Sequence, residues 1–317
     1  MAKAIWRRRV CVAALFCALA PAAAATELDG HVAIVNGLAV SPDGKQLLSA
    51  SWDYTAILWD LEAGAERRVF ADHRASVNAA AFLPNGRHGI TAGWGQAAKL
   101  WDLETGDLIR SFDGHENNIA GFALTADGAT LATASWDRTA RLWDVETGEA
   151  LLTLEGHKAN VMDAAFVDDD RLVATAGYDR VVRLWRVADG LEVAKLNGHV
   201  ASVNALSASA DGARLLSAGT DEKLLVWDVA DAQSVGELNG HEGAVFAAAL
   251  SADGRFAVSG GYDRTVRFWR LDDGPTPKSE VVGEHDGPVW AVAFNGDGTE
   301  VLSGGHDQII RRWKRPE

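Results

Sequence analysis

Hydrophobic positions along this chain fall into short segments that polar turns separate. Residues 76–82 (Ser-Val-Asn-Ala-Ala-Ala-Phe) form one such segment, and residues 55–59 (Thr-Ala-Ile-Leu-Trp) form another. The intervening clusters, such as Ser-Pro-Asp-Gly at 41–44 and Glu-Thr-Gly at 104–106, contain residues that preset turn dihedrals or tolerate a positive φ. Short strands with a turn about every 8–12 residues predict an all-β protein rather than strands alternating with helices.

A fixed period runs through the same pattern. Successive copies of one histidine stand 42 residues apart, except for a last step of 44, and a tryptophan follows each histidine by 28 residues. A period in this range is typical of stacked supersecondary units, each of which buries its apolar face against the next. The histidines are His31, His73, His115, His157, His199, His241 and His285. The tryptophans are Trp59, Trp101, Trp143, Trp185, Trp227, Trp269 and Trp313.

Two further polar positions recur in each unit. Eighteen residues after each histidine stands a hydroxyl, from Ser49, Thr91, Thr133, Thr175, Ser217, Ser259 or Ser303. Twenty-two residues after it stands an aspartate, from Asp53, Asp137, Asp179, Asp221, Asp263 or Asp307, and the second unit differs because Gly95 occupies this position. Such a set could be mistaken for a hydrolase triad. A catalytic triad occurs once, in a cleft, so six complete copies predict a structural role.

Four units close on a Trp-Asp pair, at Asp60, Asp102, Asp144 and Asp228, and most units open on Gly-His or a similar pair. In these motifs the chain resembles the WD-repeat family, without a gap from residue 30 to residue 317. The resemblance implies one domain over residues 26–317, an all-β seven-bladed propeller with four antiparallel strands per blade. It also implies that the indole, hydroxyl, imidazole and aspartate of each blade form one buried chain of hydrogen bonds.

The last unit stops just past its third strand, at residues 313–317, so its outer strand must come from elsewhere. Residues 26–31 (Thr-Glu-Leu-Asp-Gly-His) match the outer-strand endings at 195–199 and 237–241. We therefore expect residues from about 24 to 29 to pair with the last blade and close the ring, as in many WD-repeat propellers. Closure would remove an exposed sheet edge that otherwise favours aggregation.

By the same resemblance, two rows of residues face the top of the propeller around its channel. One row stands immediately before the turn aspartates, and the other stands five residues after each histidine. Both are rich in aromatic residues, which are enriched at binding hot spots. The residues expected to bind a partner are Trp52, Trp94, Trp136, Tyr178, Tyr262, His306, Phe246 and Trp290. The alternative is that these rings simply pack on their neighbours.

Charge and cysteine usage exclude several classes of function. The net charge is −14, and the four basic residues of the first 25 are balanced by no acid, so removing them leaves about −18. That field would repel phosphate backbones, so nucleic acid is not an expected partner. Both cysteines, Cys11 and Cys17, precede residue 26, which excludes a disulfide, a thiolate nucleophile and a cysteine-bound metal from the remainder. We expect neither a cofactor nor a metal.

Residues 1–25 form a segment of a different kind. A basic start is followed by an apolar run over residues 10–20, then Pro21 and a string of alanines. This layout predicts a secretory signal peptide, cleaved after Ala24 or Ala25. A membrane anchor is the weaker alternative, because the run is shorter than the roughly 20 residues that a bilayer needs. Arg8-Arg9 leaves a twin-arginine export route open. The alanine-rich leader indicates a bacterial protein that is periplasmic or secreted, without stable membrane insertion.

These features predict a non-catalytic scaffold that binds a protein or peptide through its aromatic top face. One alternative is a binder of a small ligand such as a glycan or cell-wall fragment, because tryptophan and tyrosine stack well on sugar rings. An enzyme with its site at the channel mouth is the weakest alternative. The two rows contain no acid pair and no cysteine, and His306 is their one histidine, so no catalytic residue is assigned.

Overall fold

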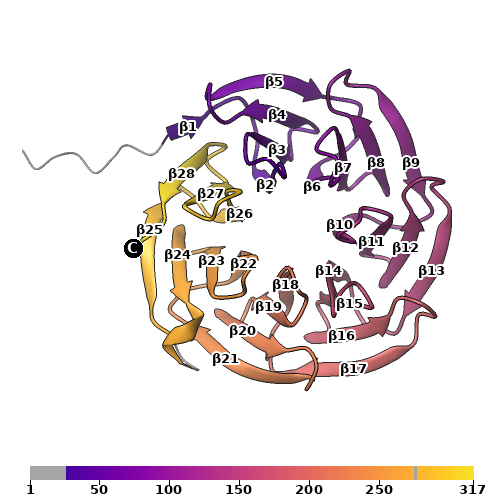
Figure 1. The fold of residues 1–317 in the computed structure, drawn as a ribbon, viewed down its shortest axis with the longest axis vertical. Helices are drawn as coiled ribbons and strands as arrows, with labels where there is room; N and C mark the ends of the chain where they lie inside the picture. The colour runs from indigo at the N-terminus through magenta and orange to yellow at the C-terminus, as the bar shows by residue number, and fades with distance from the viewer. Residues whose placement is uncertain (1–25, 275–276) are drawn as a thin grey trace, which may run out of the picture.

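The computed structural model describes residues 26–274 and 277–317. Seven four-stranded antiparallel sheets stand as blades around a common axis (Figure 1). The predictions of an all-β fold, of seven blades and of four strands in each blade are therefore confirmed. The predicted signal peptide, residues 1–25, lies outside the described residues.

In six blades the chain runs from the axis outward through all four strands, and in the last blade it does so through three. The innermost strands are β2 (Val35–Val40), β6 (Val77–Phe82), β10 (Ile119–Leu124), β14 (Val161–Val167), β18 (Val203–Ala208), β22 (Val245–Leu250) and β26 (Val289–Phe294). The second strands are β3 (Gln46–Ser51), β7 (His88–Gly93), β11 (Thr130–Ser135), β15 (Leu172–Gly177), β19 (Arg214–Gly219), β23 (Phe256–Gly261) and β27 (Glu300–Gly305). The third strands are β4 (Ala56–Asp60), β8 (Ala97–Asp102), β12 (Thr139–Asp144), β16 (Val181–Arg186), β20 (Lys223–Asp228), β24 (Thr265–Arg270) and β28 (Ile310–Lys314).

The outer strands are β5 (Ala65–Phe70), β9 (Leu108–Asp113), β13 (Ala150–Glu155), β17 (Glu192–Asn197), β21 (Gln233–Asn239), β25 (Ser279–Glu284) and, in the last blade, β1 (Thr26–Leu28). A 3-10 turn, η1 (Leu271–Asp273), follows β24. We number the blades 1 to 7 from the one that begins with β2. The top face is the one that carries the repeat histidines and the turn aspartates.

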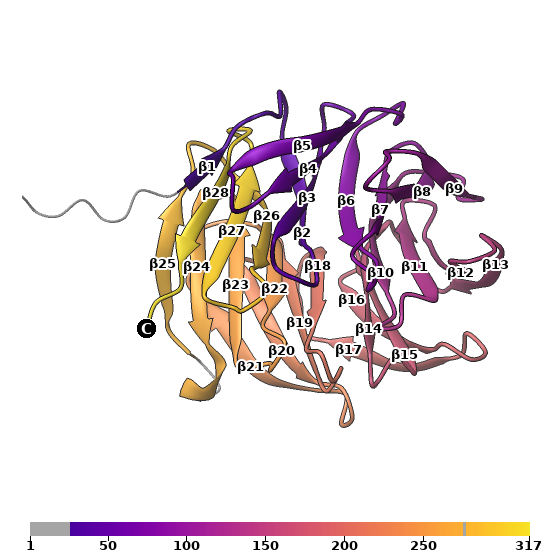
Figure 2. The same cartoon turned by 45° about the horizontal axis from the view of Figure 1, so that its top comes forward.

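The ring closes through the pairing of β1 with β28. The two strands are antiparallel, with Thr26 opposite Arg312 and Leu28 opposite Ile310. They lie side by side in both views (Figures 1 and 2). The predicted closure by an N-terminal strand in the last blade is therefore confirmed for residues 26–28, while residues 24 and 25 lie outside the described part.

The apolar core lies between the blades rather than at the ring centre. Each of seven buried clusters joins two consecutive blades, and the cluster at the closure contains Leu28, Ile310 and Trp59. Strand residues alternate between two faces, so each sheet can bury both faces against its neighbours. Because Leu28 packs in the cluster that joins blades 7 and 1, the strand that completes blade 7 also stabilises blade 1.

Every innermost strand has a bulge near its start. In β14 the register shifts between Val161 and Asp163, and the other six innermost strands shift at the equivalent place. A bulge adds one residue on one strand and redirects the side chains beside it. Consecutive residues such as Met162 and Asp163 can therefore both line the space at the axis.

Candidate functional site: an aromatic cavity on the top face

A chain of buried hydrogen bonds fixes the top face of each complete blade. In blade 3, the imidazole of His115 lies 2.6 Å from Asp137 Oδ2 through Nδ1 and 2.7 Å from Thr133 Oγ1 through Nε2. The Trp143 indole donates to the same hydroxyl at 2.8 Å. The equivalent contacts occur in blades 1, 4, 5, 6 and 7. One arrangement satisfies every group: Nδ1–H donates to the carboxylate, and the hydroxyl donates to Nε2.

The aspartate also anchors the loop before the blade. In blade 4, Asp179 accepts from the backbone N–H of Lys158, and this residue follows the repeat histidine. Burial alone would raise the pKa of Asp179, but hydrogen bonds from His157 and Lys158 lower it to about 2. The carboxylate therefore stays ionised at neutral pH and holds the top loop in one position.

The burial of the hydroxyls argues against nucleophilic chemistry at these sets. All seven repeat hydroxyls, in Ser49, Thr91, Thr133, Thr175, Ser217, Ser259 and Ser303, are 0% exposed. Each oxygen also already accepts an indole N–H. A nucleophile must reach its substrate, so a group enclosed in this way holds the fold together instead.

Blade 2 lacks the carboxylate. His73 Nε2 contacts Thr91 Oγ1 at 2.7 Å, but Gly95 offers no acceptor to Nδ1. Burial, with some repulsion from Lys99, lowers the pKa of His73 to about 4, so the ring is neutral at pH 7. Lys99 instead pairs with Asp72, the residue before this histidine, at 2.7 Å. In blade 2, the ion pair between Lys99 and Asp72 thus lies beside the loop that the turn aspartate anchors in the other blades.

Five aromatic rings form a continuous arc on the top face. The centroid of Trp94 lies 5.3 Å from that of Trp52 and 5.6 Å from that of Trp136. Trp52 lies 5.8 Å from Trp290, which stacks on Phe246 at 4.1 Å with an interplanar angle of 2°. All five rings are half-buried. The rings pack on each other, as the packing alternative expected. They also remain partly exposed, so the geometry leaves room for the binding role as well.

The arc borders a cavity of about 700 Å³ at the axis. Six of the eight residues expected to bind a partner line it, namely Trp52, Trp94, Trp136, Tyr178, Phe246 and Trp290. Tyr262 and His306 do not. Tyr262 is 63% exposed and lies over Gly243, and His306 lies over Gly287 in the same way. In blades 6 and 7 the cavity is lined instead by Phe246 and Trp290, which lie at the bulges of the innermost strands.

The other bulge residues include three asparagines that tie neighbouring blades together. Asn36 donates to the Asn78 carbonyl, Asn78 to the Ile119 carbonyl and Asn204 to the Val245 carbonyl, at 2.8–3.1 Å. The indole nitrogens of Trp52, Trp136 and Trp290 are buried and have no acceptor among the described residues. The cavity wall thus contains asparagines that link neighbouring blades. It also contains tryptophans whose indole N–H groups have no acceptor among the described residues.

Sequence reasoning missed Asp163, which also lines the cavity. Its two carboxylate oxygens accept the backbone N–H groups of Ala164 at 2.9 Å and Leu206 at 2.8 Å. Despite these bonds, burial raises the pKa of Asp163 to about 7. A signal existed in the sequence, because the residue six positions after the histidine is glycine or alanine in every other unit.

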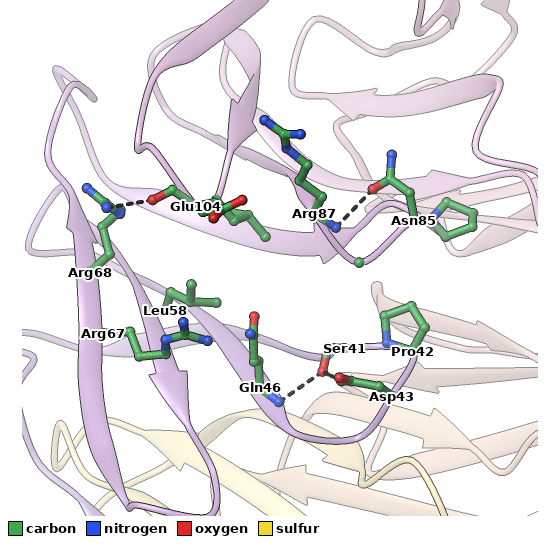
Figure 3. Close-up of a pocket in the computed structure, with 13 residues that line it drawn as sticks. Ser41, Pro42, Asp43, Gln46, Leu58, Arg67, Arg68, Asn85, Arg87 and Glu104 are labelled. Atoms are coloured by element: carbon green, nitrogen blue, oxygen red, sulfur yellow. Dashed lines mark hydrogen bonds between the residues drawn. The ribbon is translucent and has the colours of Figure 1, made fainter.

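A second pocket, of about 560 Å³, lies at the opposite ends of the strands, between blades 1 and 2 (Figure 3). Arg87 is paired with Asp102 at 2.7 Å, and Arg68 donates to the Glu104 carbonyl at 2.6 Å. Ser41 and Asp43 are hydrogen-bonded to each other in the neighbouring turn. These polar groups are already engaged in hydrogen bonds within the turns and between the two blades, so we assign no function to this pocket.

Two further observations concern residues 26–274 and 277–317. No group of three or more histidine, cysteine, aspartate or glutamate side chains there is placed to hold a metal ion. No helix in this part of the chain is long and apolar enough to cross a bilayer.

Comparison with known proteins agrees with the geometry. The family model described as WD domain, G-beta repeat, matches seven segments, at residues 24–60, 64–102, 106–144, 148–186, 190–228, 232–270 and 277–314. Each match begins near an outer strand and ends on the third strand of the next blade, so the sequence repeat is offset from the blade by one strand.

A curated relative, the Cross-pathway control WD-repeat protein 2 of Flammulina velutipes, is 49% identical over 43 residues, which is 14% of this chain and 14% of the relative. The similarity therefore covers about one repeat. Proteins built on this type of propeller are generally non-catalytic scaffolds that bind other proteins. Because the seven family matches together span most of the sequence, the chain belongs to the WD-repeat family.

Proposed function

We propose that this protein is a non-catalytic binding platform that holds a protein or peptide partner at the aromatic cavity of its top face. The observation that carries the proposal is the arc of five rings around a cavity of about 700 Å³. Aromatic side chains bury a large area on binding and lose little conformational entropy. The volume falls within the range of about 300–1,000 Å³ that is typical of ligand sites, so it suits a few side chains of a partner loop.

Hydrogen bonds hold the scaffold beneath the arc in place, which favours binding. The repeat hydrogen-bond chains fix the turns that carry Trp52 and Trp136, and Asn78 links blades 2 and 3. A surface that is already in its bound conformation loses less entropy when a partner arrives. The repeat histidine, hydroxyl and aspartate side chains are too buried to react with a substrate. Their hydrogen bonds instead hold the turns of the binding surface, which supports a binding role.

We also propose that the protein works outside the cytoplasm, in the periplasm or beyond. The proposal is supported by the basic, apolar and alanine-rich order of residues 1–25 and by the absence of cysteine from the sequence after residue 17. Fractionation of cells of the source organism, followed by N-terminal sequencing, tests it. A chain that begins near Thr26 in the periplasmic fraction is expected, and a cytoplasmic chain that retains Met1 would refute it.

The binding proposal is tested by affinity capture with three immobilised proteins. Wild type, Trp94→Ala and the control Arg67→Ala, which alters the opposite pocket, are incubated with extract of the source organism. We expect a protein that wild type and Arg67→Ala capture equally and that Trp94→Ala loses, while melting curves show all three to be folded. Equal capture by all three proteins, or a loss confined to Arg67→Ala, would place binding elsewhere.

A further inference from the structure

One carboxylate interrupts a wall of small residues at the axis. Six positions after each repeat histidine, the innermost strands carry Gly37, Ala79, Gly121, Ala205, Ala247 and Ala291, and blade 4 alone carries a charged residue, Asp163. An ionised group in such surroundings loses hydration and is costly to keep. Perturbed acids in a cavity often mark functional sites.

The surroundings of Asp163 are shaped to receive it. A Cβ atom added to Gly121 in blade 3 would lie 2.4 Å from Asp163 Oδ1, so a glycine there provides the space that the carboxylate occupies. The N–H groups of Ala164 and Leu206 fix the orientation of the carboxylate. A carboxylate has about four acceptor positions, and these two bonds leave about half of them free.

The link between blades does not require a charge. Between blades 5 and 6, the neutral Asn204 donates to the Val245 carbonyl at 2.8 Å, and the Ser207 hydroxyl accepts from Leu250 N–H at 2.9 Å. Neutral side chains therefore make the same type of contact elsewhere in the ring. The choice of a carboxyl group at position 163, whose ionised form carries a negative charge, is left without a structural explanation.

The opposite wall complements this charge. Strand β14, which carries Asp163, lies across the axis from β2 and β26 (Figure 1). Their blades supply Trp52 and Trp290 from the centre of the aromatic arc. Aromatic faces attract cations. No lysine or arginine is among the described residues that line the cavity, so none of these residues supplies a counter-ion to Asp163.

We propose that the group entering this cavity is the cationic side chain of an arginine or lysine on the protein partner. Asp163 holds the charge, and the aliphatic stem packs against the tryptophans of the arc. This inference rests on the proposed function, because it names the chemistry of the group that the partner presents. A neutral side chain or a sugar could donate hydrogen bonds to Asp163 but would not neutralise its charge.

The test uses two capped amino acids as probes, N-acetyl-arginine methylamide and its neutral isostere N-acetyl-citrulline methylamide. Binding to the full chain is followed by the shifts of the tryptophan indole N–H signals in NMR spectra. We expect the arginine probe to bind at least about tenfold more tightly than the citrulline probe. Asp163→Asn, which keeps the side-chain shape but can accept only one of the two backbone N–H groups, should reduce this preference below about threefold. The control Asp169→Asn, in an exposed turn of the same blade, should leave it unchanged.

Other outcomes would overturn the inference. Equal binding of the two probes, binding of neither, or a full preference in Asp163→Asn would each reject a cation site. Indole shifts produced by a neutral disaccharide but not by the arginine probe would indicate a glycan site instead. A partner that wild type and Asp163→Asn capture equally, and that Trp94→Ala loses, would leave the proposed function intact and reject the cation.

Discussion

In six of the seven blades, the side chain of one aspartate is hydrogen-bonded to a buried histidine. The carboxylate accepts from the imidazole and from the backbone of the preceding loop, as Asp137 does with His115 and Glu116. In blade 2 the turn has the same backbone form, since φ is 67° at Gln96 and 71° at Arg138. Blade 2 therefore differs from blade 3 at this point by a missing side chain rather than by a different turn.

Restoring this side chain should stabilise the protein. A Cβ atom at Gly95 would meet no atom within 4 Å, and Gly95 lacks a positive φ, so Gly95→Asp fits without strain. A hydrogen bond between an ionised carboxylate and the buried His73 is worth about 1.5–3 kcal/mol, so we expect a gain of about 1–2 kcal/mol after desolvation of the new acid. Urea denaturation measures it. Gly95→Ala is the control for lost backbone freedom, and a Gly95→Asp protein no more stable than this control would contradict the expectation.

The benefit of Gly95→Asp should grow as the pH falls. In wild type, burial depresses the folded pKa of His73 to about 4 from its ordinary value of 6.5. Between these values the unfolded chain binds a proton that the folded chain refuses, so stability is lost as the pH falls below 6.5. A carboxylate at position 95 would raise the folded pKa of His73 and remove much of this loss. We expect the stability difference between variant and wild type to be about 2 kcal/mol larger at pH 5 than at pH 7.

The stability difference between variant and wild type reports on His73, because titrating groups that both proteins share cancel. Asp163 has the opposite sign, because its raised folded pKa, about 7, favours the folded state at low pH and loses this contribution as the pH rises through 7. Both proteins contain Asp163, so its contribution cancels. A stability difference that does not change with pH would show that His73 is not the responsible group.

Residue roles that depend on spacing could be predicted, whereas those that depend on local packing could not. The histidine, hydroxyl and tryptophan recur at fixed offsets, so their contact follows from the repeat itself. Asp163 differs in the sequence from the glycine or alanine of the other units, but its position in the cavity depends on a bulge that the sequence does not mark, beside which both Asp163 and Met162 line the axis. Tyr262 is exposed and packs on Gly243 instead of lining the cavity, where Phe246 and Trp290 stack on each other.

At the scale of elements, the short strand β1 has an importance out of proportion to its length. Three residues pair with β28, and Leu28 enters the core between blades 7 and 1 with 1% exposure. The sequence predicted this strand because residues 26–31 repeat the outer-strand motif. Strand bounds elsewhere follow from the turn residues, and the bulges of the innermost strands were not predicted, since no residue type marks them in all seven units.

Leu28→Ala should therefore destabilise the whole ring. Removing a buried leucine side chain from a packed core costs about 2–5 kcal/mol. The control Glu27→Ala removes an exposed side chain on the same strand, whose ion pair with Arg311 at 3.1 Å is worth at most about 1 kcal/mol. Denaturation midpoints of the two variants distinguish closure from a loosely attached terminus. Equal midpoints would mean that β1 does not contribute to the stability of the ring.

At the scale of the molecule, the core lies between blades and leaves the axis free for a cavity. The aromatic arc should therefore contribute less to folding than the repeat tryptophans do. Trp94→Ala removes contacts with Trp52 and Trp136 from a half-buried site, and we expect a loss of about 1–2 kcal/mol. Trp143→Ala removes a fully buried ring and should cost about 3–5 kcal/mol. Thermal unfolding compares the two, and equal losses would assign the arc to the core.

The central claim is that a partner binds at the top-face cavity, and photo-crosslinking within the captured complex tests it most directly. A photoreactive phenylalanine analogue replaces Tyr178, which lines the cavity and is 45% exposed, or Arg67, which lines the opposite pocket. We predict a covalent adduct with the partner from position 178 and none from position 67. An adduct from position 67 alone, or from neither position while the partner remains bound, would contradict the claim.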